Sequence, residues 1–208
     1  MLTPLNPITI LHVSDIQFGK NHRFFQHEPR SPDDTFDTLL SRLLDDVRDL
    51  KNKHNVEPGL ILLTGDLAEW GMGSEFTHVE QFADGLCRGL CLTHDRVVLV
   101  PGNHDINRKS CEAYFNECAA NEDQPRRPYW PKWRLFTEFF RQFYREHPEI
   151  TFTEERPYTL FELPSLKIVI AGLNSTIAES HQDADHYGEV GEAQLRWFAD
   201  QLDRYRAS

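Results

Sequence analysis

Long hydrophobic runs are missing from this sequence of 208 residues. No stretch approaches the roughly 18 consecutive apolar residues that a membrane-spanning helix needs. The N-terminus also lacks the basic segment followed by an apolar segment that marks a signal peptide. We therefore expect a cytoplasmic protein that does not associate with a membrane.

Cysteine is scarce, and positive charge is in deficit. The four cysteines do not have the two-residue spacing of a zinc knuckle, so we expect them to be reduced and structural. The 22 Lys and Arg residues against 33 Asp and Glu residues give a net charge of −11, which disfavours nucleic acid as a partner. A basic loop from Lys20 to Arg30 is the feature that favours such a partner, although a solvated loop explains it more simply.

The apolar residues that are present predict one α/β domain covering residues 1–208. Hydrophobic residues make up 39% of the chain, enough for a full core. Short apolar runs predict strands, and apolar residues three and four positions apart predict helices. Alternating strands and helices indicate a parallel sheet covered by helices. The predicted strands are 8–13, 60–63 and 96–100, and the predicted helices are 33–54 and 75–92.

After Asp105 the pattern changes. A helical insertion is expected over about 107–150, and we interpret it as a cap. It comprises a helix over 107–120, a Pro- and Arg-rich connection over 124–131, and a helix with an aromatic stripe that we expect to pack in the core. Two strands are predicted over 158–163 and 166–171, turned at Pro164 and Ser165, and a last helix runs from Gly191 to the end.

Polar clusters follow the first three predicted strands directly. They contain Asp15 and Gln17, then Asp66, then Asn103 and His104. Ligand sites of parallel sheets form at the carboxyl ends of the strands. Asp15 and Gln17 would project to one side if they extend the strand. Carboxylate and carboxamide oxygens suit hard cations such as Mg²⁺ or Mn²⁺, and an imidazole can protonate a leaving oxygen.

Each cluster taken alone has a simpler interpretation. The first cluster is more often a helix cap or a turn, and an isolated Gly65-Asp66 pair is weaker evidence still. The absence of a Cβ at Gly65 would permit close approach at a tight turn. The occurrence of all three clusters in order after successive strands is what favours a metal site.

The clusters resemble the motifs of the calcineurin-like metallophosphoesterases. Asp15-Ile16-Gln17, Gly65-Asp66 and Gly102-Asn103-His104-Asp105 are similar to that family's D-x-H, G-D and G-N-H-[DE] motifs. The segment Gln194-Leu195-Arg196-Trp197-Phe198 is similar to its Gln-Leu-x-Trp-Leu stretch. The resemblance spans about residues 8 to 205, interrupted by the helical insertion.

This resemblance implies an α/β/β/α sandwich and two divalent metals, Mn, Mg, Fe or Zn, about 3.5–4 Å apart, which activate a hydroxide against a phosphate ester. It implies that Asp15 and Gln17 bind the first metal, that Asp66 bridges the two, and that Asn103 binds the second. Asn103 and His104 would contact the substrate, and His104 would be the catalytic residue that assists the leaving group.

The chain departs from the family pattern in two ways. Gln17 stands where the family has a histidine, which should weaken the first metal site. The sequence also has no Gly-His-x-His motif, and His181 and His186 lie upstream of the last helix rather than downstream. We therefore expect an incomplete sandwich that is the N-terminal part of a longer protein. A naturally shortened, inactive relative is the alternative.

Our hypothesis is a hydrolase domain, a metal-dependent phosphodiesterase whose substrate is a phosphate ester. The alternative is a catalytically inactive module of the same fold that binds a nucleotide, a metal or a protein partner. Gln17 and the missing histidines favour that alternative. A nuclease is a second alternative, which depends on the basic loop and is disfavoured by the net charge.

Overall fold

The computed structural model describes residues 7–22 and 38–206. Three parallel strands form the central sheet, as the apolar runs predicted, and their order in the sheet is β1-β2-β3. These strands are β1 (Thr9–Val13), β2 (Pro58–Thr64) and β3 (Val97–Val100). Val13 lies beside Leu63, and Leu63 lies beside Leu99, so the three strands end at the same edge of the sheet.

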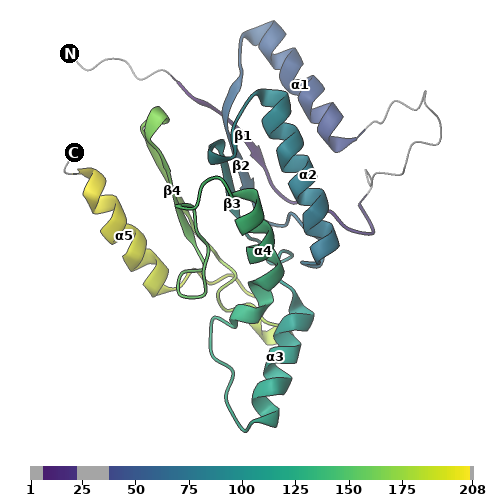
Figure 1. Ribbon diagram of the computed structural model, residues 1–208, viewed down its shortest axis with the longest axis vertical. Helices are drawn as coiled ribbons and strands as arrows, with labels where there is room; N and C mark the ends of the chain where they lie inside the picture. Colours follow the sequence, from purple (N-terminus) through teal and green to yellow (C-terminus); the bar gives the residue numbers. More distant parts are fainter. Residues whose placement is uncertain (1–6, 23–37, 207–208) are drawn as a thin grey trace.

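Two helices connect these strands and cover one face of the sheet (Figure 1). They are α1 (Leu39–His54) and α2 (Gly73–Leu90). Thr38 caps α1, because its Oγ1 accepts a hydrogen bond from the backbone N–H of Ser41 at 3.0 Å. The helix ends at Asn55, which adopts a left-handed conformation with φ of 55°. The predicted start at Asp33 and part of the basic loop, residues 23–30, lie outside the described residues.

The helical insertion contains α3 (Arg108–Ala120), a 3₁₀ turn (Trp130–Trp133) and α4 (Arg134–Phe143). The aromatic stripe of α4 is buried, as predicted, and Phe139 stacks on Phe76 of α2 with ring centroids 5.4 Å apart. The Tyr144 hydroxyl donates to the carbonyl oxygen of Val97 at 2.7 Å. α4 therefore belongs to the core layer beside α2 rather than to a separate cap, because its apolar face finds its packing partners there.

A hairpin and a last helix form the other side of the molecule. β4 (Thr159–Leu163) and β5 (Ile168–Gly172) pair in antiparallel fashion through a 3₁₀ turn (Pro164–Leu166), and α5 (Glu192–Arg206) follows. Two further 3₁₀ turns span His94–Arg96 and Asp183–Asp185. In Figure 1 the helices α1 and α2, the parallel sheet, the hairpin and α5 follow one another as layers, which is the α/β/β/α arrangement expected.

Two expectations about composition can be compared with the structure. The four cysteines are free, and all except the exposed Cys91 are buried, in agreement with a structural role. Among the described helices, none combines the length and the apolar character required to cross a lipid bilayer.

Candidate functional site

The first two strand-end loops run side by side. The N–H of Asp15 donates to the carbonyl oxygen of Gly65 at 3.2 Å, and the N–H of Gln17 donates to that of Asp66 at 2.8 Å. The expectation that Asp15 and Gln17 continue an extended strand is wrong. Their φ angles are 57° and 44°, in the left-handed region. The backbone turns at these two residues because the chain leaves β1 and runs alongside the loop after β2, with which it forms hydrogen bonds.

The third loop approaches the second at two glycines. A Cβ on Gly65 would lie 2.8 Å from the Cα of Gly102, and a Cβ on Gly102 would lie 2.3 Å from Oδ1 of Asp66. Gly65 also has a φ of 88°, which L side chains rarely adopt. The close approach expected from the missing Cβ is therefore present, and it brings the second and third clusters together.

Asp105 joins the second and third loops from inside the protein. Its Oδ1 accepts hydrogen bonds from the N–H groups of Leu67 at 2.9 Å and Ala68 at 2.8 Å, and its Oδ2 accepts from Gly102 at 2.8 Å. Burial raises the pKa of Asp105 to about 7, and the three N–H donors act in the opposite direction. Sequence reasoning assigned Asp105 no role beyond its place in the motif, although an acid directly after His104 was the available signal.

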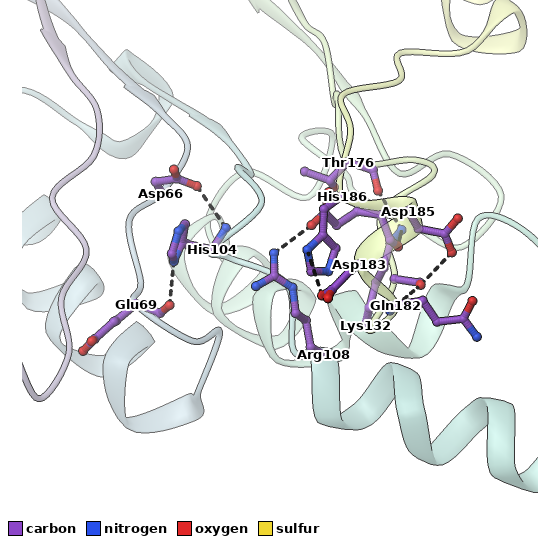
Figure 2. Close-up of polar contacts among 12 residues, drawn as sticks. Asp66, Glu69, His104, Arg108, Lys132, Thr176, Gln182, Asp183, Asp185 and His186 are labelled. Atoms are coloured by element: carbon purple, nitrogen blue, oxygen red, sulfur yellow. Dashed lines mark hydrogen bonds and ion pairs between the residues drawn. The ribbon is translucent and has the colours of Figure 1, made fainter.

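His104 is fixed at both its backbone and its ring, as Figure 2 shows. Its N–H donates to Oδ1 of Asp66 at 3.0 Å, and its ring Nδ1 lies 2.8 Å from the carbonyl oxygen of Glu69. A carbonyl only accepts, so Nδ1 carries the hydrogen in this contact. Nε2 has no hydrogen-bond partner within the described residues. The ring is thus oriented so that Nε2 is the nitrogen available for chemistry.

The predicted metal ligands provide a suitable but small set of oxygen donors. Asp15 and Asn103 are exposed, and Gln17 and Asp66 are half-buried. Within residues 7–22 and 38–206, neither the Asp15 carboxylate nor Oδ2 of Asp66 has a hydrogen-bond partner. Two carboxylates and two carboxamides fit a hard divalent cation. That part of the chain contains no group of three or more His, Cys, Asp or Glu residues that could hold a metal, and two of the four predicted ligands are amides.

The two late histidines have other contacts. The His181 ring packs edge-on against Phe115 with centroids 4.7 Å apart, and Nδ1 of His186 lies 3.8 Å from Oδ1 of Asp183. His186 and Asp183 lie across Arg108 from His104 in Figure 2.

A buried lysine in the 3₁₀ turn before α4 holds the segment that follows β5. Lys132 is fully buried, and its Nζ donates to the carbonyl oxygens of Thr176 and Glu179, each at 2.6 Å, and of Ile177 at 3.0 Å. Burial lowers the pKa of Lys132 to about 7, while nearby anionic groups oppose that change. Arg108 adds an ion pair with the buried Glu179 at 2.7 Å. No sequence motif marked these residues, because their partners lie 44 to 71 positions away.

Polar loops after three parallel strands, with an oriented histidine among them, are compatible with a metal-dependent phosphoester hydrolase. The model of the calcineurin-like phosphoesterases matches residues 8–205, and the chain belongs to that family. Members of this family generally bind divalent metals, and their substrates are phosphate esters.

Part of the chain is similar in sequence to a protein from Bacillus subtilis (strain 168). The protein, an uncharacterized metallophosphoesterase-like protein called YydB, is 32% identical over 104 residues. The matched region covers 49% of this chain and 18% of the length of YydB. The similarity therefore concerns a minor part of that larger protein.

Proposed function

We propose that these strand-end loops form a phosphodiesterase site that works with divalent cations, manganese being the cation we expect. The observation that supports the proposal most strongly is the fixed position of His104. Its backbone is bonded to Asp66 and its ring to Glu69, so that a potential proton donor lies directly beside a potential metal ligand. Membership of the phosphoesterase family supports the same reaction class.

The residues have distinct roles in this proposal. Asp15, Gln17, Asp66 and Asn103 would hold a divalent cation through their oxygens, and a second cation would need ligands beyond this set. When bound, such cations supply an activated water and neutralise charge on the phosphoryl oxygens. His104 in its imidazolium form would donate the Nε2 proton to the leaving oxygen. Asn103, on the same loop, would contact the phosphoryl group.

The test is hydrolysis of bis-p-nitrophenyl phosphate in the presence of Mn²⁺. Replacing a general acid costs about 10²- to 10⁴-fold in rate, so His104→Ala should lose activity in that range. Asp66→Asn should lose at least as much, because it removes a charged ligand. His54→Ala, an exposed histidine at the end of α1, is the control and should keep full activity. Equal rates in all four proteins would contradict the proposal.

A binding module without turnover is the second candidate. Gln17 replaces a histidine ligand, and the described residues contain no group of three His, Cys, Asp or Glu side chains suited to a metal. This candidate predicts that the wild-type protein binds Mn²⁺ and a phosphate ester but releases no p-nitrophenol. The rate measured for the wild type therefore separates the two candidates.

A further inference from the structure

A cavity of about 430 Å³ opens directly beside His104. Its volume is within the range of small-molecule sites, about 300–1,000 Å³. Two segments form its walls, the loop after β2 and the loop that leads into α3. The residues that concern its chemistry are Trp70, Met72, Asn103, His104, Ile106 and Lys109. The proposed proton donor is therefore part of the cavity wall.

The backbone on one side of the cavity is held rigidly. The buried Glu75 carboxylate accepts hydrogen bonds from the N–H groups of Trp70 at 2.9 Å and Met72 at 3.0 Å. Gly71 between them has a φ of 63°, and a Cβ there would lie 2.6 Å from the carbonyl carbon of Ile106. The side chains of Trp70 and Met72 are thus presented from a fixed backbone.

Trp70 is exposed to an unusual degree for its size. Its exposed fraction is 58%, the highest among the large apolar side chains of the described residues, and Met72 is 42% exposed. Tryptophan side chains are on average highly buried in folded proteins. A tryptophan that is exposed at the edge of a cavity is therefore better explained as part of a binding surface than as part of the core. A flat aromatic ring of a ligand can stack on the exposed indole ring of Trp70.

Within the described residues, the cavity has one unpaired positive charge at its rim, which can contact the phosphate of a ligand. Lys109 is exposed and has no ion pair within the described residues. Arg108 is neutralised by Glu179. The Glu69 carboxylate points away from His104 in Figure 2, and hydrogen bonds from Asn21 lower its pKa. The unpaired positive charge at the rim is therefore that of Lys109, in a chain whose net charge is −11.

We propose that this cavity receives the leaving group of the phosphate ester, and that this group carries a flat aromatic ring that stacks on Trp70. The phosphate would lie toward Asn103 and His104, and the ring would lie between Trp70 and the apolar side chains of Met72 and Ile106. Only the position of the phosphate in this assignment rests on the proposed function.

The test compares two ligands that share a sugar phosphate and differ in the ring. Adenosine 5′-monophosphate and ribose 5-phosphate are titrated into the protein with Mn²⁺ present, and their affinities are measured by calorimetry. Stacking of a base on an aromatic side chain is worth about 1–3 kcal/mol, or roughly 5- to 150-fold in affinity. Wild-type protein should therefore bind the nucleotide at least fivefold more tightly than the sugar phosphate.

Variants show whether Trp70 is responsible. Trp70→Ala should reduce nucleotide affinity to that of ribose 5-phosphate and leave ribose 5-phosphate affinity unchanged. Trp70→Phe should restore most of the preference, and Leu195→Ala, an exposed apolar residue on α5, should keep all of it. Equal affinities of the two ligands for wild type, no binding of either ligand, or a preference that survives in Trp70→Ala would each overturn the proposal.

The affinity measurements do not depend on hydrolysis, so they test this cavity separately from the proposed function. Ring preference without hydrolysis of any phosphate ester would support this cavity and contradict the proposed function. Hydrolysis that depends on His104 but shows no ring preference would contradict this cavity and leave the proposed function standing.

Discussion

Strand β2 of the parallel sheet and strand β5 of the hairpin differ in how completely they are buried. In the parallel sheet, Leu60, Ile61 and Leu63 of β2 have no exposed surface. In the hairpin, the residues of β5 from Ile168 to Ala171 are all half-buried. The helix behind the hairpin, α5, leaves Leu195 54% exposed. The loops that carry Asp66 and His104 therefore extend from the well-buried strands β2 and β3, whereas every residue of β1, which precedes Asp15, is half-buried or exposed.

This difference indicates where rigidity resides. Apolar burial stabilises by about 25 cal/mol per Å², so β2 and β3 should contribute more stability per residue than β5. Local opening is easiest where apolar burial is incomplete. We expect the backbone around Asp66 and His104 to be better protected from hydrogen exchange than the hairpin.

The largest expected effect is in the helical layer of α2 and α4 that packs beside the parallel sheet. Phe136→Ala removes a fully buried ring that contacts Phe76 and Phe152, and we expect a loss of about 4 kcal/mol in the free energy of unfolding. Ile170→Ala in β5 should cost about 1 kcal/mol, since the site is half-buried. Urea denaturation followed by circular dichroism measures both. Similar losses in the two variants would remove the distinction between the two regions.

Lys132→Met should have the next largest effect, because Lys132 connects the α4 side of the molecule to the segment after β5. The variant leaves three buried carbonyl oxygens without their donor, and we expect a loss of about 3 kcal/mol in the free energy of unfolding.

The burial of Lys132 also predicts that the stability of the protein depends on pH. The folded pKa of this lysine, about 7, is below the ordinary value of 10.5, so the unfolded chain binds more protons between these values.

Stability of the wild type relative to Lys132→Met should therefore rise as the pH increases from about 7 toward 10. Denaturation midpoints of both proteins at several pH values measure this rise. A difference that does not vary with pH would show that the lysine keeps its ordinary pKa.

A smaller effect is expected within the buried region itself. Asp105→Asn keeps the size of the side chain, but its amide nitrogen cannot accept hydrogen bonds, so at least one of the three N–H donors is lost. We expect a loss of about 2 kcal/mol in unfolding free energy. Hydrolysis should fall as well, because Gly102 and Ala68 help to position the two loops. Asp183→Asn, at an exposed acid, serves as the control and should change neither property.

The sequence predicted the elements well because their signals are local. The apolar runs identified β2 and β3, and the aromatic spacing identified α4 together with its core packing. The extended backbone expected at Asp15 and Gln17 was wrong, because their left-handed conformation accompanies pairing with a loop about 50 residues away, near Gly65. A strand-end pattern contains no signal for such pairing.

The residues of the candidate site also divide into those with a local sequence signal and those without one. The proximity of Asp66 and His104 could be predicted because their motifs are short and follow neighbouring strands. The roles of Asp105 and Lys132 depend on backbone groups 37 to 47 positions distant, which no local pattern reveals. The cavity wall at Trp70 was missed for a related reason, since an exposed tryptophan is recognised only when its burial is known.

The central claim is that the strand-end loops form one cation-binding site, and Mn²⁺ calorimetry tests it most directly. Wild-type protein should bind Mn²⁺, and Asp15→Asn and Asp66→Asn should each weaken binding at least tenfold, because each removes a charged oxygen ligand while keeping the size of the side chain. Asp183→Asn should bind as the wild type does. Wild-type affinity in both the Asp15→Asn and Asp66→Asn variants, or no binding by the wild type, would contradict the account.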